Sequence, residues 1–199
     1  MVPAPSEVFE VTRKVAAAFE VAGVRYFLGG SVASALYGEA RSTRDVDLVA
    51  ALLPAHVQPF VAALGEEFYA DAQAINAAVA ARRSFNLIHL DTMVKADIFV
   101  FKADAFGRSQ FSRRSSKQLS PDHPASIFVA SAEDTVLAKL QWYREGGAVS
   151  DRQWNDVLGV LKVQGPALDR GYLRQWAREL NLSDLLDRAL DDAGLPPEA

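Results

Sequence analysis

The fold is decided by the stretch Tyr26-Phe-Leu-Gly-Gly-Ser-Val-Ala-Ser-Ala-Leu-Tyr-Gly38, which continues as Arg41-Ser-Thr-Arg-Asp-Val-Asp-Leu-Val49. Its pattern is typical of a short apolar strand, a glycine turn, a short helix and a second strand. Gly29 and Gly30 lack a Cβ, so the backbone can turn tightly there and a bulky anion can approach its amides. Ser31 suits the N-cap of the helix, whose free N–H groups and positive dipole end favour an anion. The stretch therefore predicts an anion-binding turn between two strands.

Three aspartates lie on predicted strands. Asp45 and Asp47 are two residues apart on the second strand, and because side chains alternate between faces, both carboxylates point to the same face. Two like charges side by side need a cation. Asp97 lies within the apolar run Met93–Phe101, where a lone acid is expensive unless it is solvated, paired or bound to a metal. Each feature alone also fits a structural role: a helix cap, a solvated strand edge, or an acid paired with an arginine such as Arg44.

The remaining pattern predicts an α+β fold with a mixed half followed by a helical half. The first half is expected to contain helices at about residues 6–22, 31–38, 54–65 and 71–81 and strands at about 25–28, 44–50, 68–69, 85–90 and 93–101. After a loop at residues 120–124 the chain is expected to be helical, with capping-box patterns at Ser131 and Ser150. We therefore expect two domains, an α+β core over residues 1–117 and a C-terminal helical bundle over residues 118–199 packed on it.

The composition of the 199 residues is that of a globular protein, with 50% hydrophobic residues and 23% charged residues. The absence of cysteine excludes disulfides and thiolate metal sites, and it fits a reducing compartment. No apolar run approaches the roughly 20 residues of a membrane span, so a cytoplasmic location is expected. The net charge of −4 argues against a surface built throughout for nucleic acid, although bases outnumber acids between Lys102 and Lys117.

The order of these motifs resembles the DNA polymerase β-like nucleotidyltransferase superfamily, and most closely its abortive-infection (AbiEii/AbiGii toxin-type) nucleotidyltransferases. The resemblance rests on Gly29-Gly30-Ser31, on Arg41-Ser-Thr-Arg-Asp-Val-Asp47 and on Lys95-Ala-Asp97. It extends into the helical half through Ser131-Ala-Glu-Asp-Thr-Val-Leu-Ala-Lys-Leu140 and Ser150-Asp-Arg-Gln-Trp-Asn-Asp156. It implies a mixed β-sheet of the nucleotidyltransferase type, flanked by helices and followed by helices.

The resemblance also implies a reaction and its ligands. A nucleoside monophosphate would move from a nucleoside triphosphate to an acceptor hydroxyl, with pyrophosphate as the leaving group. Asp45, Asp47 and Asp97 would hold two Mg²⁺ ions, with Mn²⁺ as an alternative, since these ions prefer oxygen ligands and can stabilise the attacking and leaving oxygens. The phosphates would be bound by residues of the glycine turn, of the segment before the second strand and of the helical half: Gly29, Gly30, Ser31, Arg41, Thr43 and Lys139.

The candidate catalytic residues are Asp45, Asp47 and Asp97 together with two residues of the helical half, Lys139 and Asp156. A structural role is an equal alternative for each of the latter two, because a lysine beside an apolar helical line commonly extends its ammonium to solvent and an aspartate on a helix face is common.

Three functions remain open from the sequence. The leading hypothesis is a toxin-like nucleotidyltransferase whose acceptor is an RNA end, a protein side chain or a small molecule. The second is a catalytically silent nucleotide-binding or partner-binding module of a toxin–antitoxin pair, with an antitoxin as partner. The third is an enzyme that modifies a small hydroxylated compound such as an antibiotic. The sequence predicts no oligomeric state.

Overall fold

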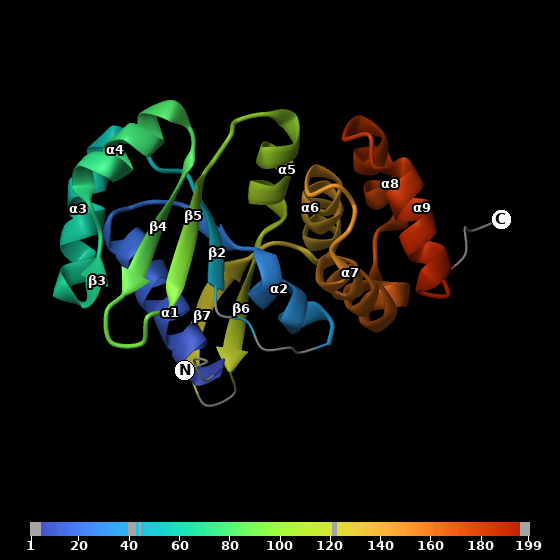
Figure 1. The fold of residues 1–199 in the computed structure, drawn as a ribbon, viewed down its shortest axis with the longest axis horizontal. Coiled ribbons are helices and arrows are strands. Elements are labelled where there is room, and N and C mark those ends of the chain that lie inside the picture. The colour runs from blue at the N-terminus through green and yellow to red at the C-terminus, as the bar shows by residue number, and fades with distance from the viewer. Residues whose placement is uncertain (1–4, 40–42, 44, 121–122, 196–199) are drawn as a thin grey trace. The chain divides into compact units, whose positions relative to one another are not determined.

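The computed structural model describes residues 5–39, Thr43, 45–120 and 123–195. The described strands have the following bounds: β1 Tyr26–Leu28, β2 Asp45–Ala50, β3 Phe68–Tyr69, β4 Ser84–His89, β5 Lys95–Val100, β6 Ser115–Ser120 and β7 His123–Val129. They form one mixed sheet in the order β3-β4-β5-β2-β1-β7-β6, in which β2 and β5 are parallel and β1 and β2 antiparallel (Figure 1). The expected fold class, a mixed sheet with flanking helices in an α+β protein, is confirmed.

The helices of the described residues alternate with these strands in the first half and follow one another in the second. Their bounds are α1 Pro5–Val21, α2 Gly30–Tyr37, α3 Pro54–Leu64, α4 Ala72–Ala81, α5 Ala105–Arg113, α6 Ala132–Glu145, α7 Asp151–Gln164, α8 Arg170–Glu179 and α9 Ser183–Asp192. Short 3₁₀ turns at Gly65–Glu67 and Gly165–Ala167 follow α3 and α7. Among the residues that the structure describes, no helix is long and apolar enough to cross a bilayer.

The strands β6 and β7 were not expected, because residues 118 onward were predicted to form a loop and then helices. Ser120 and His123 belong to these strands, and residues 121–122 lie outside the described residues. The segment Ser115–Ser120 is polar and forms an edge of the sheet, where a strand does not need the apolar alternation that marks a half-buried one. The helical half therefore begins at Ala132, and the division into domains at residue 117 stays a prediction.

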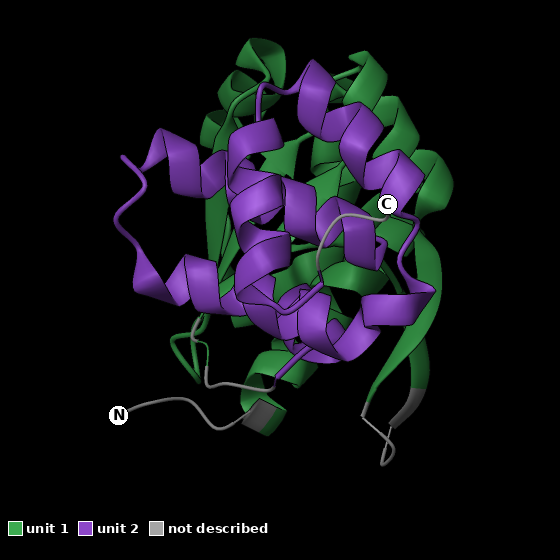
Figure 2. Cartoon of the chain, turned by 90° about the vertical axis from the view of Figure 1, so that its right-hand side faces the viewer, with its two compact units in different colours: residues 1–29, 42–129 green, residues 30–41, 130–199 purple. Residues whose placement is uncertain are grey.

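The chain forms two compact units (Figure 2). Unit 1 comprises Met1–Gly29 and Ser42–Val129, and unit 2 comprises Gly30–Arg41 and Ala130–Ala199. The sheet lies in unit 1, and the chain leaves it after β1 and after β7, which pair in parallel at Leu28 and Val129. Unit 2 contains α2 together with α6 to α9, so the short helix after the glycine turn belongs to the helical unit.

Within unit 1, the two faces of the sheet carry different residues. Tyr26 stacks on Phe19 of α1 with ring centroids 5.6 Å apart, and it lies opposite Ala50 on β2. The alternate residues of β2 and β5 on this face are all buried: Val46, Leu48, Ala50, Ala96, Ile98 and Val100. Phe27 points to the other face and contacts Phe111 of α5 at 5.0 Å. That face also receives the odd-numbered residues of β2 and β5, among which are the four charged residues of these strands: Asp45, Asp47, Lys95 and Asp97.

Within unit 2, α2 packs closely on α7. A Cβ added to Gly38 would lie 2.7 Å from the carbonyl carbon of Gly159 and from the amide nitrogen of Val160. A Cβ on Gly159 would in turn lie 3.3 Å from the amide nitrogen of Glu39. The absence of a side chain at Gly38 therefore permits this packing distance, and α2 is held against the helix that carries Asp156.

Candidate active site

Asp45, Asp47 and Asp97 lie on the same face of two neighbouring strands. Strands β2 and β5 pair in register, so Asp45 lies opposite Lys95 and Asp47 lies opposite Asp97. Val46 and Leu48 point into the core, which turns both β2 aspartates outward. The expectation that the two β2 carboxylates share a face is confirmed. The parallel pairing adds Asp97 to that face as a direct cross-strand neighbour of Asp47.

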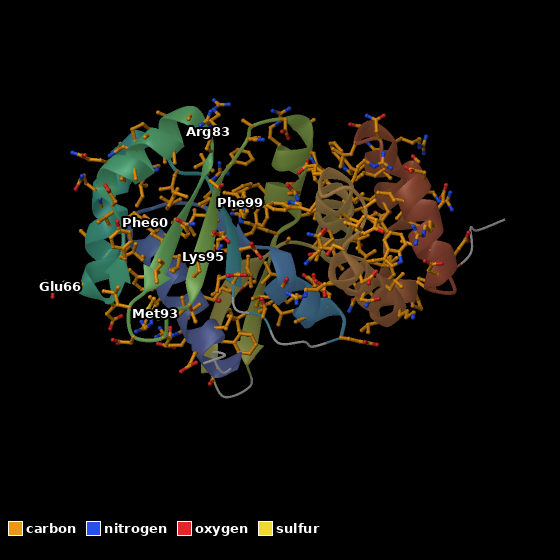
Figure 3. The ribbon with its side chains drawn as sticks, viewed as in Figure 1. Phe60, Glu66, Arg83, Met93, Lys95 and Phe99 are labelled. Atoms are coloured by element: carbon orange, nitrogen blue, oxygen red, sulfur yellow. The ribbon has the colours of Figure 1, made fainter. Side chains whose placement is uncertain are left out.

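Lys95 supplies a positive charge within this acidic face. Its Nζ lies 2.8 Å from Oδ2 of Asp97 and 4.0 Å from Oδ1 of Asp45. The hydrogen bond to Asp97 raises the pKa of Lys95, and the charges of Asp97, Asp45 and Asp47 raise it further, against a smaller opposing effect of burial. Figure 3 labels Lys95 near one end of β5 and Phe99 further along the same strand. Asp97 is thus paired with Lys95, whereas the arginine suggested from the sequence, Arg44, lies outside the described residues.

Sequence reasoning used Lys95 only as part of a motif and gave it no role. The signal was available, because Lys95 lies two residues before Asp97 and must share its face of the strand. The position of Lys95 opposite Asp45 could not be predicted, because the register of two strands that are distant in sequence is set by their packing.

The carboxylates have the donor chemistry that Mg²⁺ requires. In the residues that the structure describes, no three or more His, Cys, Asp or Glu side chains are arranged as a metal-binding group. Mg²⁺ sites, however, commonly take one or two carboxylates and complete the shell with water and substrate phosphates. Three carboxylates on adjacent strands, two of which lie within 4.0 Å of the ammonium group of Lys95, fit that requirement. Asp47 and Asp97 are half-buried and Asp45 is exposed, so the face is open to a ligand.

The glycine turn is anchored on β2 at Asp47. The amide of Gly29 donates to the carbonyl oxygen of Asp47 at 2.8 Å. Gly30 has φ of 57°, a left-handed value that favours glycine, and α2 begins there. Ser31 was expected to be the N-cap but lies in the first turn of α2, because the helix starts one residue earlier.

The segment before β2 contributes Thr43, whose Oγ1 donates to the carbonyl oxygen of Asp45 at 3.3 Å and accepts from its amide at 3.4 Å. Thr43 therefore fixes the backbone at the first aspartate. Arg41, the other candidate of this segment, lies outside the described residues.

In unit 2 the helices bring three predicted residues together. Nζ of Lys139 on α6 lies 2.7 Å from Oδ2 of Asp156 on α7 and 3.3 Å from Oγ of Ser31 on α2. The side chains of Lys139 and Asp156 are only 11% and 5% exposed. Lys139 therefore points into unit 2 and does not extend to solvent, and the cluster joins the three helices.

A second buried acidic group, which the sequence did not single out as a site, lies at the start of α6. Asp134 is fully buried and accepts hydrogen bonds from the hydroxyls of Tyr172 at 2.7 Å and Ser131 at 2.9 Å. Glu133 accepts from the amide of Asp169 at 3.0 Å, at the N-terminus of α8. These contacts connect α6 to α8, so the two acids have a structural role.

Comparison with known proteins defines the class of fold. No protein-family model and no curated protein sequence matches the chain. Among solved structures, the chain matches an antigenic nucleotidyltransferase-like protein from Paracoccidioides brasiliensis with a TM-score of 0.64 and 17% identity, over 98% of this chain and 95% of the other. The fold is therefore that of nucleotidyltransferase-like proteins.

An antibiotic adenylyltransferase and an antibiotic-resistance factor share this fold. The lincosamide antibiotic adenylyltransferase LnuA, in its lincomycin-bound structure, matches with a TM-score of 0.52 and 17% identity, over 82% of this chain and 99% of that protein. The antibiotic-resistance factor ANT(2'')-Ia matches with a TM-score of 0.51 and 12% identity, over 88% of this chain and 94% of that protein.

Proposed function

We propose that the protein is a metal-dependent nucleotidyltransferase that transfers a nucleoside monophosphate from a nucleoside triphosphate to an acceptor hydroxyl. The observation that carries this proposal is the register of β2 and β5, which places Asp97 directly opposite Asp47 and on the same face as Asp45. The shared fold with nucleotidyltransferase-like proteins supports it. A cytoplasmic location follows from the same proposal, since the substrate is a nucleoside triphosphate.

In this proposal Asp45, Asp47 and Asp97 hold Mg²⁺, or Mn²⁺ in its place. The ions, when bound, neutralise charge on the attacking and leaving oxygens of an in-line displacement. The carboxylates are fixed by the paired strands, and Thr43 fixes the backbone at Asp45 through two hydrogen bonds. Preorganised ligands of this kind cost little reorganisation when charge develops during the reaction.

From the sequence motifs, the phosphates are assigned to Gly29, Gly30, Ser31 and Lys139. Gly29 and Gly30 offer a backbone without side chains, and Ser31 follows with a hydroxyl that Lys139 contacts at 3.3 Å. Asp156 keeps Lys139 in place through its carboxylate. Lys139 acts in this scheme as the cation for a phosphate oxygen, and Arg41 is assigned the same task from the sequence motif.

The proposal has two versions that differ in the acceptor, and a third candidate function has no turnover. A toxin-like enzyme of the AbiEii type would modify an RNA end or a protein side chain and would be controlled by an antitoxin. The likeness to LnuA and ANT(2'')-Ia favours a small hydroxylated compound such as an antibiotic as the alternative acceptor. A silent module would bind the triphosphate without turnover, and the presence of the third carboxylate, Asp97, speaks against it.

The test is transfer of label from α-³²P-labelled nucleoside triphosphates in the presence of Mg²⁺, with RNA, protein and hydroxylated antibiotics such as lincomycin as acceptors. The double variant Asp45→Asn/Asp47→Asn should lose transfer. The matched control Asp91→Asn/Asp187→Asn removes two exposed carboxylates elsewhere and should retain it. Equal transfer by the wild type and the Asp45→Asn/Asp47→Asn variant would refute the site. Binding of triphosphate without pyrophosphate release with any acceptor would identify the silent module.

A further inference from the structure

Lys95 lies among the aspartates of the acidic face and is close to two of them. Its ammonium contacts Asp97 at 2.8 Å and approaches Asp45 at 4.0 Å. The side chain of Lys95 is 40% exposed and that of Asp97 is 22% exposed. Partly solvated pairs of this kind contribute little to folding stability, because water screens them and both side chains lose conformational freedom. The pair therefore adds little to the stability of the sheet, and breaking it would cost little.

The ammonium and a divalent ion compete for the same oxygens. Oδ2 of Asp97 can accept the lysine hydrogen bond or bind a metal ion, and a +1 charge a few ångströms from a +2 ion repels it. A lysine carries its charge on a flexible four-carbon stem, so the ammonium can leave the carboxylate without a change in the backbone. Lys95 can thus alternate between the carboxylates and a negatively charged group that arrives with the ion.

We propose that Lys95 is the resident counter-ion of the acidic face: it pairs with Asp97 and partly offsets the charge of Asp45 before the divalent ion binds, is displaced from Asp97 by the ion, and then contacts the triphosphate. This inference rests on the proposed function. It makes Lys95 a positioning residue that weakens binding of the free ion and strengthens binding of the ion together with triphosphate. Binding of the two ligands is thereby coupled, and the coupling is reciprocal.

The experiment measures two affinities that should change in opposite directions. Binding of Mn²⁺ alone is measured by electron paramagnetic resonance of the free ion at fixed ionic strength. Lys95→Met should bind Mn²⁺ about five- to tenfold more tightly than the wild type, as expected for the loss of one nearby positive charge in a largely aqueous site. In the presence of Mg²⁺, the same variant should bind a non-hydrolysable triphosphate about three- to tenfold more weakly. A purely structural role of Lys95 would lower both affinities together.

The controls separate the inference from the function on which it rests. Lys95→Arg keeps the charge and should keep the weak Mn²⁺ binding, and Lys162→Met removes an exposed charge of α7 and should change neither affinity. Asp45→Asn/Asp47→Asn should lose Mn²⁺ binding. If that variant binds Mn²⁺ as the wild type does, the proposed metal site fails and the inference with it. If it loses binding but Lys95→Met binds Mn²⁺ no more tightly than the wild type, the inference alone is overturned.

Discussion

Replacement of Lys139 by methionine is expected to lower the free energy of unfolding by about 3 kcal/mol. The change keeps most of the length of the side chain but removes the ammonium that lies 2.7 Å from Oδ2 of Asp156. Loss of one member of a buried pair costs about 3–5 kcal/mol, and the lower end of that range applies because the two side chains retain 11% and 5% exposure. At about 2–4 °C per kcal/mol for a chain of this size, the melting temperature should fall by about 6–12 °C.

A double-mutant cycle tests this reasoning. Urea denaturation of the wild type, Lys139→Met, Asp156→Asn and the double variant gives the four free energies of unfolding. The double variant should lose about 2 kcal/mol less than the sum of the single losses, because no unpaired buried charge remains in it. Lys162→Met, an exposed change on α7, should stay within about 0.5 kcal/mol of the wild type. Single losses below about 1 kcal/mol that simply add would show that the pair is solvated and would contradict the expected cost of removing one buried partner.

Two further predictions concern packing and pH. Gly38→Ala should lower the free energy of unfolding by about 2 kcal/mol, because the added Cβ would lie 2.7 Å from the main chain at Gly159. Gly159→Ala should be nearly neutral, because the 3.3 Å contact of its Cβ with the amide of Glu39 is offset by the higher helix propensity of alanine. Equal melting temperatures for the two variants would contradict this. Burial and then a hydrogen bond to Glu20 raise the pKa of Tyr26 above its ordinary value, so this hydroxyl contributes stability that is present below about pH 10 and is lost as the pH rises beyond it. Tyr26→Phe should therefore lose less stability than the wild type between about pH 10 and 11.5 in urea denaturation, and parallel losses would contradict the assignment.

Local patterns predicted the parts of the site that lie on one strand. The spacing of Asp45 and Asp47 was sufficient to place both carboxylates on one face, because alternation along a strand is a property of the backbone. The pairing of Asp47 with Asp97 was beyond local reasoning, since it depends on the register of β2 and β5. The sequence motif identified Asp97 as a candidate, and the register of the sheet shows that it lies opposite Asp47.

The same limit applies to the helical unit. Lys139 and Asp156 each had a structural alternative of equal weight, because neither apolar spacing nor charge shows which side chains of two helices meet. Their contact follows from the packing of α6 on α7, and the contact of Lys139 with Ser31 follows from the packing of α2 on both. The edge strand β6 was missed for a different reason: all its residues except Leu119 are polar, and they give no periodic apolar signal.

The parallel pairing of β2 with β5 has a consequence for how the site is assembled during folding. Asp47 and Asp97 are neighbours in space but fifty positions apart in the chain, and α3, β3, α4 and β4 lie between them. A parallel pair of this separation closes a long loop, which makes such contacts slow to form. The acidic face therefore cannot exist in a chain that ends before β5. Because Lys95 and Asp97 share that strand, the third carboxylate and the charge that balances it arrive in the same folding step.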